Sequence, residues 1–335
     1  MSFLTKPEPE FIQLLQRTAS ENRDEASVAM AELAKAIELP LREGIMVGDI
    51  ASNIYERIAM PAGSSTEFPL DLISPGEEND FVAYVAPAHG RVPERTVEGD
   101  YVMVPTYTIA NSIDWLLRYA REARWDVVAR ATQVLEAGFV KKMNDDAWHT
   151  ILAAGVDRNI LVYDADAAAG QFTKRLVSLL KVVMRRNAGG NSASVKRGQL
   201  TDLYLSPEGV EDMRNWGIDQ LDETSRREIY VANDGAGSVS RVFSVNLHAI
   251  DELGEGQEYQ EFYDNVLSGT LPGGDTELVV GLDLRKRDSF IMPVRQEVQI
   301  FEDDTLHRQK RAGFYGWSEQ GFAVLDNRRV LLGSL

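Results

Sequence analysis

Four histidines are the side chains of this sequence best suited to acid–base catalysis or metal binding at neutral pH. They stand far apart, at His89, His149, His248 and His307. None lies within helical reach of another, so the HExxH pattern of a zinc peptidase is absent. His89 is interpreted as a surface histidine, with a ligand role as its alternative, and His149 as a packed or rim residue. The histidines therefore predict no metal site.

Paired carboxylates and glycine-rich loops give the same result. Adjacent carboxylates diverge on any regular element and are solvated faces rather than acid–base dyads. Some segments resemble the phosphate-binding pattern GxxxxGK[ST] or the serine elbow GxSxG, but each lacks a required residue or spacing. The residues concerned are Asp145-Asp146, Asp303-Asp304, Gly189-Gly190 with Lys196-Arg197, Gly190–Ser194 and Gly316–Gln320. We expect no catalytic, cofactor-binding or metal residues and no enzyme activity; an enzyme with an unrecognised active site is the alternative.

Composition narrows the class of protein further. The 335 residues carry a net charge of −17 and no cysteine. This charge argues against a tight nucleic-acid binder, because such affinity comes from lysine and arginine on phosphates. It is compatible with plain solubility or with a container whose acidic wall avoids sticking to nucleic acid. No run of about 18 apolar residues and no secretory signal is found, so we expect no membrane span.

The N-terminal part is predicted to be helical. Apolar residues among many charges indicate an amphipathic helix over residues 8–38. A second short helix is expected near Asp49, with Ile50, Ile54 and Ile58 at fourth positions and with Pro40 and Gly44 separating the two. The first helix either packs on its own core or forms an arm on neighbouring subunits.

A long β-hairpin is predicted for residues 63–111. Its strand-like runs are Phe81–Val85 and Tyr101–Tyr107, rich in β-branched and aromatic residues. An isolated two-stranded ribbon is barely stable in water. We therefore expect another subunit to cover it.

The longest predicted element is a helix over residues 124–154, within the stretch Asp114–Gly155. No proline follows Arg124 in this stretch, and apolar residues recur at three-and-four spacing. About 30 residues at 1.5 Å each give about 45 Å, which is long for a core helix. The pattern indicates a strut in an extended subunit.

Mixed α/β elements and then strands follow the strut. Residues 171–186 and 222–230 are predicted helices, and Leu200–Leu205 and Arg241–Leu247 predicted strands. Ser206-Pro207-Glu208 has the chemistry of a helix start. Loops are expected at residues 187–198, 233–240 and 268–275. The closing strands are predicted at residues 277–284, 289–294, 297–302, 313–319, 321–326 and 329–332.

This order of elements resembles the major capsid proteins of tailed bacteriophages, which have the Hong Kong 97-type α+β shell fold. TDLYLSPEGVEDMRNW (201–216) and the closing RQKRAGFYGWSEQGFAVLDNRRVLLGSL are similar to the family's strand-to-helix segment and terminal β-elements. The resemblance implies a helical arm (1–62), an E-loop hairpin (63–111), a spine helix with the first part of a peripheral domain (112–164), an axial domain (165–275) and closing strands shared by both domains (276–335).

The resemblance also implies a function. The chain is expected to assemble through hexamers and pentamers into the icosahedral head that encloses a phage genome, with a portal and, in some cases, a decoration protein. The packaged DNA would touch it only weakly and non-specifically. We expect it in the virion, after assembly in the host cytoplasm. An encapsulin-like nanocompartment shell is the alternative within the same fold.

Two departures from the family pattern inform this reading. Some members carry a fused scaffolding segment before the arm, whereas only residues 1–62 precede the hairpin here, so a separate scaffolding protein is expected. In some members the subunits are covalently cross-linked by an isopeptide bond from an E-loop lysine. No lysine occurs between Lys35 and Lys141, so the shell is expected to be held non-covalently.

Charge suggests which residues meet between subunits. The hairpin is acidic, and basic residues lie elsewhere in the chain, so we hypothesise that the hairpin lies over a neighbour's basic patches. Ordinary surface charge is the alternative. The candidates are Glu77, Glu78, Arg91, Arg95, Arg285, Lys286, Arg287, Arg328 and Arg329. Trp216, Phe314 and Trp317 are either interface anchors or plain core.

Overall fold

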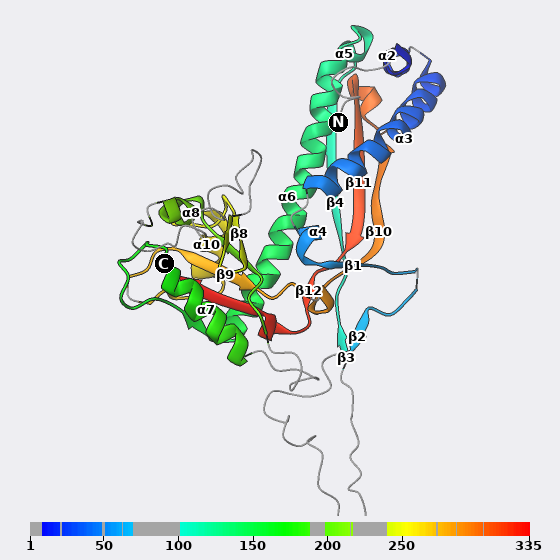
Figure 1. The fold of residues 1–335 in the computed structure, drawn as a ribbon. Coiled ribbons are helices and arrows are strands. Elements are labelled where there is room, and N and C mark those ends of the chain that lie inside the picture. Colours follow the sequence, from blue (N-terminus) through cyan, green and yellow to red (C-terminus); the bar gives the residue numbers. More distant parts are fainter. Residues whose placement is uncertain are drawn as a thin grey trace, which may run out of the picture. The chain divides into compact units, whose positions relative to one another are not determined.

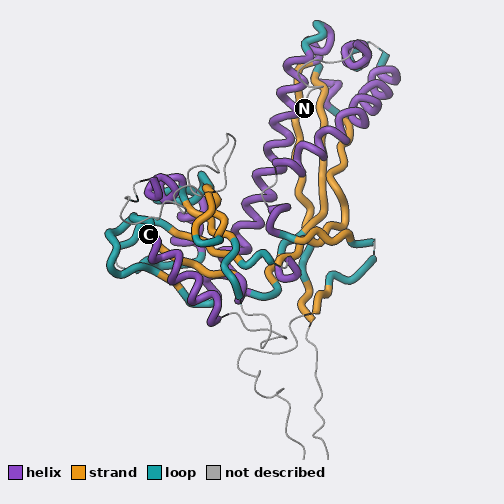
Figure 2. Tube along the Cα trace, viewed as in Figure 1, coloured by secondary structure: helices purple, strands orange, loops and turns teal. Residues whose placement is uncertain are grey.

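The computed structural model (Figures 1 and 2) describes residues 9–20, 22–48, 51–61, 63–69, 101–187, 198–214, 216, 240–272, 274–285, 287–303 and 305–335. The chain forms two compact units. The first comprises Met1–Thr66, Met103–Ala147 and Ile291–Ala323. The second comprises Glu67–Val102, Trp148–Phe290 and Val324–Leu335. Each unit therefore draws on segments that are far apart in the sequence.

A long sheet is the centre of the first unit. Its strands follow the order β1-β10-β11-β4, and β12 (Ala323–Val324) also pairs with β10. Strand β1 (Glu56–Ala59) runs parallel to β10 (Phe290–Glu302), whereas β11 (Arg311–Gln320) is antiparallel to both β10 and β4 (Tyr107–Leu116). The β4–β11 pairing is unbroken from Tyr107↔Gln320 to Leu116↔Arg311.

The two faces of this sheet differ in burial. Ile109 and Trp115 of β4 are buried, as are their partners Ser318 and Ala312 of β11. The alternate residues form a second face, which we call the open face: Thr108, Ala110, Ser112 and Asp114 of β4, Arg311, Tyr315, Trp317 and Glu319 of β11, and Gln296, Gln299 and Phe301 of β10. Side chains on the open face are exposed or half-buried. This alternation is that of a sheet with one face on a core.

Helix α6 (Trp125–Asp157) covers the buried face and confirms the predicted spine helix. Its 33 residues span about 50 Å. Gly138 allows the close approach of α6 to β4, because a Cβ there would lie 2.4 Å from Nδ2 of Asn111. The same Nδ2 donates to the Leu135 carbonyl at 3.3 Å. On β11, Gly316 lies against the ring of Phe139.

Helix α3 (Arg23–Gly48) packs on the same face as α6, with α2 (Pro9–Arg17) before it. Figure 1 shows α3 crossing β10 and β11. Ser27 lies 3.4 Å from Glu302 of β10. The predicted single helix over 8–38 is interrupted, because Asn22 accepts a hydrogen bond from the Asp24 N–H and begins α3.

The predicted separation of two arm helices by Pro40 and Gly44 is wrong, since both residues lie inside α3. Ile37, Leu41 and Ile45 form one continuous buried stripe through this region, and its burial outweighs the local helix breakers. The predicted second helix is only α4 (Ala51–Ile54). Ile58 belongs instead to β1, which pairs with β10, a tertiary contact that fourth-position spacing cannot reveal.

The predicted hairpin is described only at its ends. Strands β2 (Glu67–Pro69) and β3 (Tyr101–Met103) pair as a two-stranded sheet, here called the ribbon. Residues 70–100, including the predicted strand Phe81–Val85, lie outside the described residues. The predicted strand Tyr101–Tyr107 is in fact interrupted: β3 ends at Met103 and β4 begins at Tyr107, then continues to Leu116.

The second unit contains a sheet of order β5-β13-β9-β6-β8-β7. Its strands are β5 (Leu161–Val162), β6 (Asp202–Leu205), β7 (Ser240–Val242), β8 (Val245–Ala249), β9 (Leu278–Leu282) and β13 (Val330–Ser334). Helices α7 (Lys174–Asn187) and α8 (Pro207–Arg214) accompany the sheet, and Phe172, Leu180, Leu203 and Leu331 share its core. Ser206 caps α8 as predicted, accepting from the Gly209 N–H at 3.0 Å.

Two other strand predictions need correction. Arg241–Leu247 is a hairpin, because Phe243 and Ser244 adopt positive φ angles of 48° and 63° and turn the chain between β7 and β8. The two strands predicted at 289–294 and 297–302 form the single strand β10, which absorbs the irregularity as register shifts between Val294 and Gln299. The predicted helix at 222–230 lies outside the described residues.

The short remaining elements complete the chain. Helix α5 (Leu117–Arg121) follows β4 directly, and α10 (Glu258–Glu261) continues into the π-helical turn η2 (Phe262–Val266). Three 3-10 turns, η3 (Arg287–Ser289), η4 (Leu306–Gln309) and η5 (Asn327–Arg329), precede β10, β11 and β13 respectively. The described residues thus form an α+β fold.

Candidate assembly surfaces

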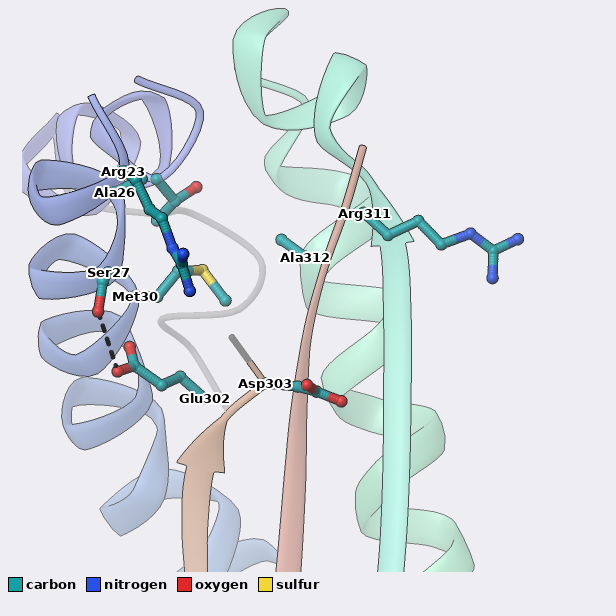
Figure 3. A pocket seen from close by; sticks show the side chains of 9 residues that line it. Arg23, Ala26, Ser27, Met30, Glu302, Asp303, Arg311 and Ala312 are labelled. Carbon is teal, nitrogen blue, oxygen red and sulfur yellow. Dashed lines mark hydrogen bonds between the residues drawn. The ribbon is translucent and has the colours of Figure 1, made fainter. Parts of the chain in front are cut away.

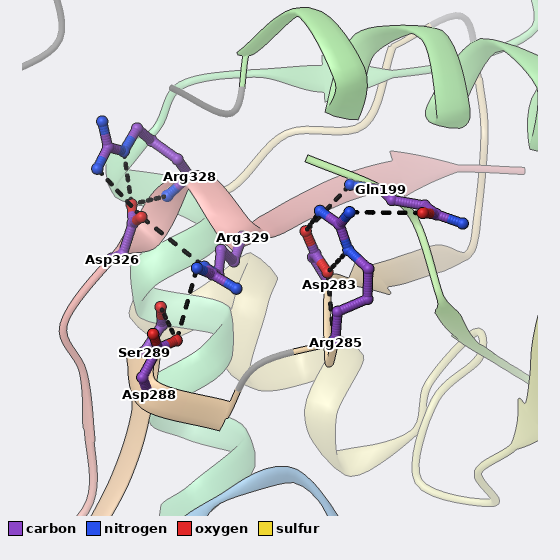
Figure 4. Close-up of polar contacts among 8 residues, drawn as sticks. All are labelled: Gln199, Asp283, Arg285, Asp288, Ser289, Asp326, Arg328 and Arg329. Atoms are coloured by element: carbon purple, nitrogen blue, oxygen red, sulfur yellow. Dashed lines mark hydrogen bonds and ion pairs between the residues drawn. The ribbon is translucent and has the colours of Figure 1, made fainter. Parts of the chain in front are cut away.

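The structure places only part of the predicted assembly residues. Glu77, Glu78, Arg91, Arg95 and Lys286 lie outside the described residues. Arg287 begins η3, but its side chain is not described. The other three candidates, Arg285, Arg328 and Arg329, lie in the second unit, and Figure 4 shows each of them directed at a carboxylate of the same chain.

Arg285 holds a buried carboxylate at the end of β9. Its Nε donates to Oδ1 of Asp283 at 2.9 Å and its Nη2 to Oδ2 at 2.7 Å. Asp283 is 1% exposed and also accepts from the Gln199 N–H at 3.0 Å. Burial by itself raises the pKa of Asp283, but the hydrogen bonds from Arg285 and Gln199 outweigh it and hold that pKa below its usual range. Arg285 therefore stabilises the junction between β9 and the chain entering β6.

A second cluster fixes the turn before β13. Arg328 binds Asp326 through Nε at 2.6 Å and Nη2 at 3.1 Å, and its side chain is only 7% exposed. Arg329 lies between two carboxylates, 3.5 Å from Asp288 and 3.9 Å from Asp326. Asn327 donates to Asp157 at the end of α6 at 2.8 Å. These contacts hold the turn in place, so an interface role for Arg328 and Arg329 stays a prediction.

One local pattern could have identified these pairs. Asp283-Leu284-Arg285 and Asp326-Asn327-Arg328 share the spacing Asp-x-Arg. In both, the carboxylate accepts from the arginine's own backbone N–H and from its guanidinium. Such a turn is stabilised by local side-chain hydrogen bonds, and the arginine does not need a partner from another chain.

The three aromatic candidates have different roles. Phe314 is buried and packs edge-on against Trp115 at 5.1 Å. Trp216 stacks on Phe172 at 5.5 Å and donates to the Phe172 carbonyl at 2.9 Å. Trp317 is half-buried on the open face of the first unit. Phe314 is therefore core, Trp216 is half-buried and packs against the core of the second unit, and Trp317 is half-buried on the open face.

Trp317 belongs to a cluster of three rings that the sequence reading missed, here called the aromatic triad. Its ring centroid is 4.6 Å from that of Phe301 and 5.5 Å from that of Tyr315, and Phe301 and Tyr315 are 5.6 Å apart. The pairs Phe301↔Tyr315 and Gln299↔Trp317 are opposite each other on β10 and β11. The spacing Tyr315-x-Trp317, with alternate burial along β11, is the signal that places both rings on one face.

A small cleft lies between α3 and the strands β10 and β11 (Figure 3). It is lined by Thr18, Arg23, Ala26, Ser27, Met30, Glu302, Asp303, Arg311 and Ala312. The side chain of Arg311 points away from α3 in this view. The lining residues include a serine and two carboxylates but no histidine or lysine that could activate a nucleophile. The cleft therefore has no arrangement recognisable as catalytic.

Within the described ranges, no three histidine, aspartate or glutamate side chains gather as a metal site. No helix in that part of the chain combines the length and apolar character that a membrane crossing requires.

Comparison with known proteins finds the fold rather than a close relative. No protein-family model and no curated protein sequence matches the chain. A structure of Microbacterium phage Oxtober96 matches with a TM-score of 0.58 and 11% identity, over 86% of this chain and 90% of that one. The capsid of an empty GTA particle matches with a TM-score of 0.56 and 12% identity over 86% and 90%. Mycobacterium phage Bobi follows with a TM-score of 0.52 and 12% identity over 86% and 89%.

These matches show the fold of the chain. The chain has the α+β Hong Kong 97-type fold of phage and GTA capsid proteins, organised around the spine helix α6. The resemblance inferred from the order of elements is confirmed.

Proposed function

We propose that the chain is a major capsid protein that assembles through hexamers and pentamers into the icosahedral head enclosing the DNA of a tailed phage. The observation that carries this proposal is the match to capsid structures over 86% of the chain and 90% of the matched chain.

The ribbon supports assembly from copies of one chain. Tyr101 and Met103 are 67% and 70% exposed, so the described residues leave both side chains largely uncovered. Two-stranded ribbons are marginal in water unless something packs on them. In a shell, a neighbouring copy is the partner that is always present. The ribbon is the part of the molecule that gains most from assembly.

The proposed shell is held non-covalently. The chain has no cysteine, and its hairpin contains no lysine for an isopeptide bond. Each contact between copies is therefore weak, and the particle depends on apolar burial repeated over many copies. The net charge of −17 limits packaged DNA to weak, non-specific contact.

Other components belong to the proposal. A portal and a separate scaffolding protein would accompany assembly in the host cytoplasm, and a decoration protein is compatible with the finished virion. The division into arm (1–62), E-loop (63–111), spine and first peripheral part (112–164), axial domain (165–275) and closing strands (276–335) is part of the same proposal.

Electron microscopy of the purified, full-length protein tests the proposal. We expect closed icosahedral particles after expression alone or together with a scaffolding protein. Nuclease-protected DNA inside particles recovered from phage-producing cells supports a phage head. Particles that contain protein cargo and no DNA would indicate the alternative, an encapsulin-like nanocompartment. A monomer or small oligomer under all these conditions contradicts a shell function.

A further inference from the structure

Helix α7 differs in charge from the rest of the chain. Its 14 residues, KRLVSLLKVVMRRN, include five lysines and arginines and no aspartate or glutamate. The whole chain, in contrast, has 35 basic and 52 acidic residues. Leu176, Leu180 and Met184 of α7 are buried in the core of the second unit, so the opposite side of the helix faces outward. An acidic protein therefore exposes one basic helix surface.

Ion pairs neutralise only the first turn of this helix. Arg175 binds two carboxylates, Asp164 at 3.4 Å and Asp166. Further along the helix, Nζ of Lys181 donates to the Phe243 carbonyl at 2.6 Å. A carbonyl group carries no net charge, so this hydrogen bond holds the ammonium group in place without neutralising it.

The last turn of α7 carries two further cations, Arg185 and Arg186. Both are exposed, and neither forms a hydrogen bond or ion pair with another residue in the part of the chain that the structure describes. Lys181 and Arg185 are four residues apart, which makes them neighbours on the helix surface, about 6 Å apart along its axis. Lys181, Arg185 and Arg186 are here called the basic strip.

We propose that the basic strip contacts the phosphodiester backbone of the DNA that the shell encloses. This inference rests on the proposed function and assigns the weak contact with packaged DNA to three residues of the second unit. A DNA duplex presents about one negative charge per 1.7 Å of its axis, so the strip meets phosphates in any base sequence. Contacts to phosphate carry no sequence information, as enclosure of a whole genome requires.

Three cations in an acidic chain give a weak and strongly salt-dependent contact. Neutralisation of three phosphates predicts a slope of about −2.7 for the logarithm of the binding constant against the logarithm of the salt concentration. Between about 50 and 200 mM salt, the affinity should therefore fall about 40-fold. Binding of this kind lets DNA slide along the protein, so the strip would hold DNA near the wall without trapping it.

Fluorescence anisotropy of a short labelled duplex, titrated with the unassembled full-length chain at several salt concentrations, tests the strip. Arg185→Gln/Arg186→Gln removes two of its three cations. We expect the double variant to bind the duplex about tenfold or more weakly at about 50 mM salt and to lose about two units of the salt slope.

Arg118→Gln/Arg121→Gln is the matched control. Both arginines are exposed and lie in the last turn of α5, so this variant removes the same charge from the same position of another helix. It should bind the duplex as the natural chain does. The melting temperatures of both double variants should equal that of the natural chain, which separates loss of DNA binding from loss of structure.

A second experiment examines the DNA inside particles. Because the natural chain has no cysteine, Arg186→Cys and Val266→Cys each carry a single thiol for a photoactivatable label. Val266 is 65% exposed in the same unit and supplies the background level. Irradiation of DNA-filled particles should cross-link the label at position 186 to DNA well above that background. Equal cross-linking from the two positions would overturn the assignment.

The outcomes separate this contact from the proposed function. Equal duplex binding by the two double variants overturns the strip, as does a natural chain that binds no duplex at about 50 mM salt. Labelled poly-glutamate tests for an acidic protein partner: if Arg185→Gln/Arg186→Gln loses only poly-glutamate binding and keeps duplex binding, the DNA contact is overturned. If the natural chain forms no particles, the shell function fails, and the measured contact with the duplex is judged by the anisotropy alone.

Discussion

The Asp283–Arg285 pair of the second unit and the Asp114–Arg311 pair of the first join the same two chemical groups in different surroundings. The Asp283 side chain is 2% exposed and accepts four hydrogen bonds, three from Arg285 and one from Gln199. The Asp114 side chain is 39% exposed, and its ion pair with Arg311 measures 3.0 Å. The buried Asp283–Arg285 pair stabilises the fold, whereas the exposed Asp114–Arg311 pair is accessible to a partner. A basic residue near the surface is therefore not by itself an interface residue.

Replacing Arg285 is expected to have the largest effect on the subunit. Arg285→Ala leaves the carboxylate of Asp283 buried with two backbone donors but no cation, which should lower the free energy of unfolding by about 2–3 kcal/mol. Urea unfolding at pH 7 measures it. Arg308→Ala, on an exposed arginine, is the control and should change stability by less than about 0.5 kcal/mol. A loss below 1 kcal/mol for Arg285→Ala would show that the two kinds of pair do not differ.

This expectation revises an idea that follows from charge alone. If the acidic hairpin lay over a neighbour's basic residues, reversing the charges of Arg285 and Arg287 would reduce particle yield without unfolding the subunit. The contacts of Arg285 indicate that reversal places a second negative charge beside Asp283, so the subunit itself is destabilised.

Two glycines test how firmly the sheet of the first unit is packed. In Gly313→Ala the new Cβ would lie 2.5 Å from the backbone oxygen of Ile113 and 3.0 Å from Cα of Asp114, so the β4–β11 pairing must shift. We expect this shift to lower the free energy of unfolding by about 2 kcal/mol. In Gly44→Ala the Cβ would meet the carboxyl group of Glu136 at 2.3 Å. That side chain can rotate, and alanine favours helix, so the net change should stay within about 1 kcal/mol. Thermal unfolding distinguishes them; equal losses would mean that α3 and α6 are as rigidly packed as the strands.

The pH dependence of two buried carboxyl groups should have opposite sign. The pKa of Asp283 is depressed, so its stabilising contribution is present above its unfolded value near 3.8 and is lost as pH falls through its lower folded value. Burial raises the pKa of Glu277, although Ser206 donates to it, so the fold favours its protonated form. The stabilising contribution of Glu277 is therefore present at low pH and is lost as the pH rises through the pKa of Glu277 in the folded state.

Amide variants separate the two effects. Relative to the natural chain, Asp283→Asn should be less stable at pH 7, with a difference that narrows toward pH 3. Glu277→Gln should be more stable at pH 7 by about 1 kcal/mol, a gain that disappears toward pH 4. Urea unfolding at several pH values measures both. Parallel pH profiles for the two variants would contradict the assignment.

The exposed pair should have the smallest effect on the subunit. Arg311→Ala is expected to lower the free energy of unfolding by no more than about 0.5 kcal/mol, because both partners are more than a third exposed. If the open face receives a second copy, the same variant should still reduce particle yield. A large loss of subunit stability would show that the open face is part of the fold in the same way as the Asp283–Arg285 turn.

Long, regular elements were predictable from the sequence. The spine helix followed from spacing and the absence of proline, and the cap at Ser206 from local chemistry. The arm was predicted less well, because burial of Ile37, Leu41 and Ile45 carries α3 through Pro40 and Gly44. Strand β4 was missed beyond Tyr107, since its pairing with β11 joins residues about 200 positions apart. The Asp-x-Arg spacing is present in the sequence, but only the structure shows that each arginine binds the aspartate two residues before it.

By itself, the amino-acid sequence predicted the fold from a long helix and an order of elements typical of shell proteins. Local spacing and composition suffice for such features, because they depend on neighbours along the chain. Only the tertiary structure decided which arginines are bound within the chain and which aromatic rings stay accessible. Burial depends on residues that meet from distant segments, and burial determines whether a charge or a ring is part of the core or a surface for another copy.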